Sequence, residues 1–157
     1  MKTISFEERL AKILKKKKKT LSLAESCTGG LIASRITDLS GSSDYFLGGV
    51  TAYSDNVKMS VLDVPRNIIK KNGAVSREVA KAMAEGAKAR TSSDFSASVT
   101  GVAGPSGGTG RKPVGLAFIA FSDGKKTRTK KLQYKGDRGA LKKKFSDAVL
   151  KLILDNM

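Results

Sequence analysis

The stretch LSLAESCTGGLIASRIT, residues 21–37, decides the fold class. Its first four residues form a short apolar run, which is typical of a buried strand. Residues 25–30 end in two glycines and indicate a turn. Leu31, Ile32, Ile36 and Leu39 then follow with the spacing of one helical face. A strand that leads through a tight turn into a helix is a basic unit of α/β proteins.

The same alternation extends in both directions from this unit. Upstream, Ser5 and Glu8 form a capping-box sequence, which predicts a helix that ends in the lysine run 15–19. Downstream, capping residues and periodicity predict helices that begin at Asp55, after Pro65, at Ser76 and at Asp137. Strands are predicted over residues 46–53, around 95–99, over 114–121, and in a polar segment that ends near residue 134.

The order of these elements predicts the architecture. Helices and strands alternate early in the chain, and the last two strands form a predicted hairpin. This order favours a three-layer α/β/α sandwich with a mixed sheet, as one domain over residues 1–157. In the last helix, the spacing predicts an inward face of Leu141, Phe145, Ala148 and Leu152.

The residues that are absent limit the chemistry. The chain has no histidine, which excludes Ser-His-Asp and Cys-His catalysis and leaves zinc with almost no ligands. Any acid–base chemistry must therefore use Lys, Tyr, Asp, Glu or backbone groups. One cysteine and no apolar run of about 18 residues favour a cytoplasmic protein without a membrane span.

The net charge of +16 raises the possibility of nucleic-acid binding. However, residues 1–19 carry +6 and residues 111–157 carry +9, whereas residues 20–110 carry only +1. Aromatic residues make up 6% of the chain and tryptophan is absent, so stacking platforms are few. A nucleic-acid-binding module therefore remains an alternative, and the unusual motifs lie in the nearly neutral middle.

Two of these motifs together indicate a nucleophile and its base. Ser26 lies at the carboxyl end of a strand, where open α/β sheets bind ligands, and the next helix offers N–H groups for an oxyanion or phosphate. A serine needs a neighbour that takes its proton, and Lys58, in the first turn of a helix, can do so when it is neutral. Tyr53 could relay that proton or orient the lysine. The alternatives are a plain helix cap, a surface lysine and a half-buried tyrosine.

Two further segments could contact a substrate. Residues 101–113 hold five glycines and two prolines after a strand, and backbone N–H groups in such a loop can bind anions. Arg138, at the start of the last helix, could hold a phosphate or carboxylate with two hydrogen bonds. A flexible loop and a solvated arginine are the alternatives.

Taken together, the motifs resemble one family. The strings LSLAESCTGGLIASRIT, GGVTAYSDNVK, GAVSREVAKAMAEGA, TGVAGPSGGTGRKPVGLAFIA and KGDR occur in the order and spacing of the CinA C-terminal domain family. Stand-alone members of that family are called nicotinamide-nucleotide amidases. The resemblance covers residues 5 to 154. One departure is Lys142, which stands where the family usually has an arginine.

The resemblance implies an α/β/α fold and hydrolysis of nicotinamide mononucleotide to nicotinate mononucleotide and ammonia. It implies Ser26 as the nucleophile, Tyr53 and Lys58 as its partners, no cofactor, and a homodimer or higher homo-oligomer. The substrate pocket would include Thr28, Gly29, Gly30, Thr100, Gly101, Ala103, Gly104, Pro105 and Arg138. A catalytically silent mononucleotide-binding domain is the main alternative. Nucleophilic chemistry at Cys27 is a weaker one, because no histidine is present to activate it.

Overall fold

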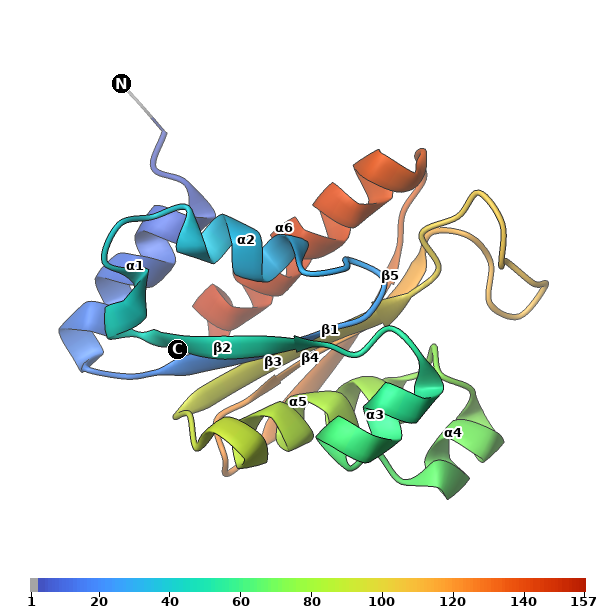
Figure 1. The fold of residues 1–157 in the computed structure, drawn as a ribbon. Helices are drawn as coiled ribbons and strands as arrows, with labels where there is room; N and C mark the ends of the chain where they lie inside the picture. The colour runs from blue at the N-terminus through green and yellow to red at the C-terminus, as the bar shows by residue number, and fades with distance from the viewer. Residues whose placement is uncertain (1–2) are drawn as a thin grey trace.

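A five-stranded sheet in the order β2-β1-β3-β4-β5 forms the centre of the fold. The computed structural model describes residues 3–157, and Figure 1 shows helices on both faces of this sheet. The strands are β1 (Leu21–Glu25), β2 (Phe46–Thr51), β3 (Phe95–Gly101), β4 (Leu116–Ser122) and β5 (Thr127–Gln133). The predicted three-layer arrangement is therefore confirmed.

The sheet is mixed, as predicted. β1 pairs in parallel with both β2 and β3, whereas β3–β4 and β4–β5 are antiparallel. Glu25, the last residue of β1, is in register with Thr51 and Val99. The carboxyl ends of all three parallel strands therefore meet at one edge of the sheet, and the chain segments that follow them converge there.

Two groups of helices cover the two faces (Figure 1). α1 (Phe6–Lys17), α2 (Leu31–Thr37) and α6 (Arg138–Asn156) lie on one face, and α3 (Asp55–Leu62), α4 (Arg66–Asn72) and α5 (Arg77–Thr91) lie on the other. A short 3₁₀ turn, Ser42–Asp44, precedes β2. The predicted caps of α1, α5 and α6 are confirmed, including the reciprocal Ser5–Glu8 capping box. Among residues 3–157, no helix is both long and apolar enough to cross a bilayer.

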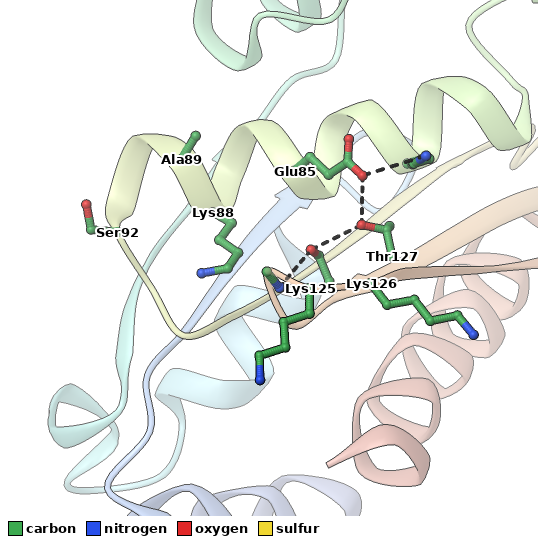
Figure 2. Close-up of a pocket in the computed structure, with 10 residues that line it drawn as sticks. Glu85, Lys88, Ala89, Ser92, Lys125, Lys126 and Thr127 are labelled. Atoms are coloured by element: carbon green, nitrogen blue, oxygen red, sulfur yellow. Dashed lines mark hydrogen bonds and ion pairs between the residues drawn. The ribbon is translucent and has the colours of Figure 1, made fainter.

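The face of β3 beneath α5 is buried although its side chains are polar. Ser96 and Ser98 donate their hydroxyl protons to the carbonyls of Ala84 and Ala80 on α5, at 2.6 and 2.5 Å. Beside Ala84, Glu85 of the same helix accepts a hydrogen bond from the partly buried hydroxyl of Thr127 on β5 at 2.8 Å (Figure 2). Hydrogen bonding satisfies these buried hydroxyls, so the helix packs closely on strands that are polar in sequence.

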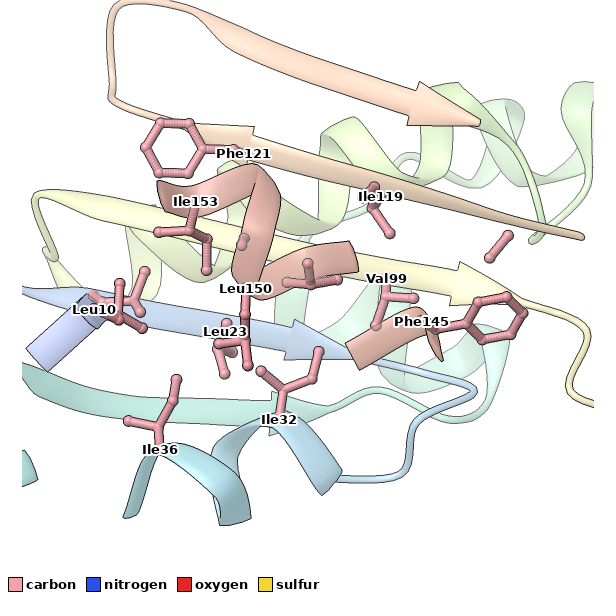
Figure 3. Packing of buried hydrophobic residues seen from close by; sticks show 14 of the residues in the cluster. Leu10, Leu23, Ile32, Ile36, Val99, Ile119, Phe121, Phe145, Leu150 and Ile153 are labelled. Atoms are coloured by element: carbon pink, nitrogen blue, oxygen red, sulfur yellow. The ribbon is translucent and has the colours of Figure 1, made fainter. Parts of the chain in front are cut away.

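The main hydrophobic core lies on the opposite face. Leu23, Val99 and Ile119 project from three neighbouring strands towards α1, α2 and α6, which contribute Leu10, Ile32 and Leu150 (Figure 3). Every one of these side chains is at most 1% exposed. This core fixes β1 and α2 relative to each other, and therefore fixes the turn that joins them.

The predicted cap of α3 is wrong by one residue, and the buried face of α6 is wider than predicted. Ser54, rather than Asp55, caps α3, because its side chain accepts the N–H of Val57 at 3.2 Å. Lys58 consequently lies one position further into the helix than predicted. In α6, Leu141 and Phe145 are fully buried as expected, and Ala148 and Leu152 are partly buried and pack against the main core. Val149 and Ile153, which were not predicted, are fully buried beside them. The helix keeps a spacing of four residues there, so its inward face turns slightly along its length.

Candidate active site

Ser26 is the first residue after β1, at the edge where the parallel strands end. Its N–H donates to the carbonyl of Val99 at 3.1 Å, and its own carbonyl accepts the N–H of Gly29 at 3.0 Å. The residue is 7% exposed. Hydrogen bonds to two separate segments therefore hold the serine in place at the end of the strand.

Lys58 reaches Ser26 from the first turns of α3. The chain after β2 is held against β1 by the Ala52 N–H, which donates to the Glu25 carbonyl at 2.8 Å. Two residues later the Ser54 cap starts α3, and Lys58 points back towards β1. Its ammonium Nζ donates to the Ser26 Oγ at 3.1 Å, and its side chain is 2% exposed. The structure thus brings together the serine and the lysine of the predicted pair.

The surroundings of Lys58 favour its neutral form. Burial lowers its pKa from the ordinary lysine value, because a buried ammonium loses its hydration. The carboxylate of Asp55, 4.0 Å from Nζ, opposes this effect and raises the pKa. Burial has the larger influence, so a neutral amine forms at lower pH than on an exposed lysine. A neutral Lys58 can accept the hydroxyl proton of Ser26 across the same contact.

Tyr53 contacts Lys58 through its main chain. Its carbonyl accepts a hydrogen bond from Lys58 Nζ at 3.2 Å, while its side chain is 60% exposed. The phenolic oxygen instead accepts a hydrogen bond from Arg138 at 3.0 Å, and Arg138 also donates to the Gly104 carbonyl at 2.6 Å. Arg138 therefore joins α6, the segment before α3 and the glycine-rich loop at the edge of the site.

A cavity of about 340 Å³ opens beside Ser26 and Lys58. Of the residues expected to bind substrate, Thr100, Gly101, Ala103, Gly104 and Arg138 line it, together with Tyr53. Thr28, Gly29, Gly30 and Pro105 are not among the residues that line it. The hydroxyl of Thr100 is engaged by the Ala74 carbonyl at 2.9 Å, so this residue offers the cavity little hydrogen-bonding capacity.

Sequence reasoning missed several residues that line the cavity: Asp55, Ala74, Val75, Val102, Ser106 and Gly107. Ser106 and Gly107 belong to the glycine-rich loop and could have been named from it. Ala74 and Val75 come from the segment between α4 and α5, and no chemical signal in their residue types could have identified them.

Glu25 changes the role expected for the start of α2. Its carboxylate accepts the Thr28 hydroxyl at 2.7 Å and the N–H groups of Ile32 and Ala33 at 2.9 and 3.1 Å. The Gly29 and Leu31 N–H groups bond carbonyls of the turn itself. Much of the helix end that the sequence offered to an anion is thus occupied by Glu25, which is 2% exposed. The N–H groups of Thr28 and Gly30 have no acceptor within residues 3–157.

Cys27 is a packed thiol beside Ser26. It is 6% exposed and belongs to the main core. Burial raises the pKa of its thiol to about 12, so it carries no appreciable thiolate near neutral pH. Within residues 3–157, no three side chains of His, Cys, Asp or Glu come together as a metal site would require.

Comparison with known proteins identifies the family of this arrangement. The family model described as the CinA C-terminal domain matches residues 3–157. A CinA-like protein of Geotalea daltonii is 50% identical over 141 residues, which cover 90% of this chain and 34% of the relative. A CinA-like protein of Desulfotalea psychrophila is 54% identical over 125 residues, which cover 80% and 30%. The chain therefore spans about a third of the length of these relatives.

Solved structures agree over nearly the whole chain. The competence/damage inducible protein CihA of Agrobacterium tumefaciens superposes with a TM-score of 0.94 at 31% identity, covering 99% of this chain and 98% of that one. A competence-damaged protein (CinA) superfamily protein of Escherichia coli gives a TM-score of 0.94 at 29% identity, covering 100% and 93%.

Proposed function

Since this chain belongs to the CinA C-terminal domain family, we propose that it hydrolyses the carboxamide of nicotinamide mononucleotide, with Ser26 as nucleophile and Lys58 as general base. One observation carries the proposal: the buried Lys58 Nζ lies 3.1 Å from the Ser26 Oγ in a chain without histidine. Ser–Lys pairs are a recognised variant of serine catalysis, and a lysine of lowered pKa suits the role of base.

The reaction begins with proton transfer. Neutral Lys58 takes the proton of the Ser26 hydroxyl while Oγ forms a bond to the carboxamide carbon. The tetrahedral intermediate collapses, its C–N bond breaks, and the Lys58 ammonium returns the proton to the leaving nitrogen as ammonia. Water then attacks the ester, again with Lys58 as base, and releases nicotinate mononucleotide and the serine hydroxyl.

Backbone donors next to Ser26 would stabilise the oxyanion. The N–H groups of Thr28 and Gly30 have no acceptor within residues 3–157, whereas Glu25 holds those of Ile32 and Ala33. Thr28 and Gly30 do not line the cavity, so this role rests on their place in the turn that directly follows Ser26. One oxyanion-hole donor is typically worth about 3 kcal/mol in the transition state. By fixing the turn, Glu25 keeps such donors in place before the substrate arrives.

Positive charge at the edge of the cavity suits the substrate phosphate. Arg138 lines the cavity and could exchange its bond to Tyr53 for a bidentate bond to phosphate. Lys142 Nζ lies 3.7 Å from the point where a Cβ on Gly29 would stand, so this lysine also faces the turn after Ser26. It supplies a charge where the family usually has an arginine, but without the planar fork of that side chain.

Ammonia release from nicotinamide mononucleotide tests the proposal. We expect release by the wild type and none above background by Ser26→Ala. Ser106→Ala is the matched control, because Ser106 lines the same cavity, and it should keep most of the activity. Binding of the mononucleotide without ammonia release in the wild type would instead establish the silent binding domain. Full activity in Ser26→Ala would refute Ser26 as nucleophile.

A further inference from the structure

A second and larger cavity, of about 630 Å³, lies at the other end of the sheet. It lies between the second half of α5 and the turn that joins β4 to β5 (Figure 2). Ser122 in its wall pairs with Ser96 at the start of β3, whereas Ser26 follows the end of the parallel strand β1. The cavity is therefore separate from the candidate active site.

Its wall is strongly basic. Among the described residues, four lysines line it, namely Lys81, Lys88, Lys125 and Lys126, and Glu85 is the one carboxylate. Lys81 lies 4.0 Å from Glu85, but within residues 3–157 Lys88, Lys125 and Lys126 form no ion pair. The carboxylate of the neighbouring Asp123 is already engaged by the N–H groups of Lys125 and Lys126, both at 2.8 Å, and by Arg128 at 3.1 Å. The positive charge of the cavity is thus only partly neutralised, because four lysines face one carboxylate in the described wall.

The basic groups come from a defined local structure. The two bonds to Asp123 hold the turn that carries Lys125 and Lys126. Lys88 extends from α5 towards that turn (Figure 2) and donates to the Ser93 carbonyl at 2.6 Å. A Cβ on Gly124 would lie 2.6 Å from Lys88 Cε, so the glycine provides the space that Lys88 occupies. The ammonium group of Lys88 is thus held in place, and such a preorganised charge loses less entropy on binding than a freely mobile side chain. The side chains of Lys125 and Lys126 are exposed, and only their main chain is held by Asp123.

The composition of the wall indicates the class of ligand. None of the described residues that line the cavity is aromatic, so these residues offer no platform for stacking a base. The hydroxyls of Ser92, Ser122 and Thr127 add hydrogen-bonding groups, and the lysines act as point charges. A volume of 630 Å³ exceeds the needs of one inorganic phosphate. We infer that this cavity binds the phosphate chain of a small oligophosphate, either a free chain or the chain of a nucleoside triphosphate.

Calorimetric titration with tripolyphosphate at physiological ionic strength tests the inference. The wild type should bind one equivalent, and Lys125→Gln/Lys126→Gln should bind about tenfold more weakly. Lys70→Gln/Lys71→Gln is the matched control, because it removes the same charge from exposed positions on α4 outside this cavity. It should bind within about twofold of the wild type.

A parallel titration with a nucleoside triphosphate distinguishes the two sources. Equal affinity for both probes indicates that the natural ligand is a free oligophosphate. Tighter binding of the nucleoside triphosphate indicates that the natural ligand is a nucleotide. The inference fails if tripolyphosphate shows no saturable binding to the wild type. It also fails if Lys70→Gln/Lys71→Gln weakens binding as much as Lys125→Gln/Lys126→Gln does. It also fails if a single-stranded oligonucleotide binds more tightly and displaces tripolyphosphate. Ammonia release should be unchanged in Lys125→Gln/Lys126→Gln, so this test and that of the amidase stand independently.

Discussion

Replacing Asp55 by Asn should move the pH dependence of the reaction in a direction that the structure fixes. The Asp55 carboxylate lies 4.0 Å from Lys58 Nζ and stabilises its ammonium form. Loss of this charge lowers the pKa of Lys58 further. Because a general base acts only when deprotonated, the rising limb of kcat/KM against pH moves to lower pH.

The size of this shift follows from Coulomb's law. Two unit charges 4 Å apart interact by about 1 kcal/mol in water, and by several times more in less polar surroundings. The side chain of Asp55 is 55% exposed, so the value in water is the better guide, although the burial of Lys58 increases it. One pH unit corresponds to about 1.4 kcal/mol, so we expect a shift of about one pH unit.

The assay measures kcat/KM for ammonia release across the neutral to alkaline range, because this quantity reports groups of the free enzyme. Asp38→Asn serves as the control, since it removes the same charge from an exposed position at the end of α2. An unfolding curve should accompany each variant, because Asp55 is the first residue of α3 and its charge stabilises that end by up to about 1 kcal/mol. A limb that stays in place, or moves to higher pH, would refute Lys58 as the base.

Three further substitutions test the roles of the Tyr53 hydroxyl, the Cys27 thiol and the glycine at position 86. Tyr53→Phe removes the hydroxyl that accepts from Arg138 but keeps the carbonyl that holds Lys58, so KM should rise a few-fold while the pH limb stays in place; a collapse of kcat would assign the hydroxyl a direct catalytic role. Cys27→Ser should keep ammonia release at a cost of about 1 kcal/mol in unfolding free energy, because the neutral thiol packs in the core; complete inactivity in a folded protein would contradict this. Gly86→Ala places a Cβ 2.0 Å from the Leu62 carbonyl oxygen and should cost about 3 kcal/mol in denaturant unfolding, whereas Gly139→Ala, whose nearest neighbour lies at 3.6 Å, should be neutral or stabilising.

The fold was predictable because its signals are local. The Ser5, Ser76 and Asp137 caps each lie within three residues of the N–H groups that they accept, so a short stretch of sequence contains the whole interaction. The cap of α3 was assigned one residue too late, because two adjacent residues there give the same local signal. Ser54 and Asp55 are both good capping residues, and only the main-chain conformation selects Ser54.

The role of Glu25 was not predictable from its position. A glutamate at the end of a strand usually faces solvent, yet here the turn folds back and brings its carboxylate to the N–H groups of residues seven and eight positions later. The dipole of α2 and the buried charge stabilise each other. No spacing of residues predicts such a contact, because the contact depends on the main-chain path through the glycines between β1 and α2.

The pairing of Ser26 with Lys58 shows where sequence reasoning needs the structure. A chain without histidine limits the candidate bases, but this chain has many lysines, and only one becomes a base if only one is desolvated. That desolvation requires α3 to lie close to the end of β1. α3 reaches this position because Gly86 of α5 presents no side chain to the main chain of Leu62, the last residue of α3. A single glycine, remote from Ser26 and without chemical function, therefore contributes to the buried environment that lowers the pKa of Lys58. Gly86→Ala should accordingly lower both the free energy of unfolding and the kcat of the molecules that remain folded. Loss of stability alone would leave the kcat of the folded molecules unchanged.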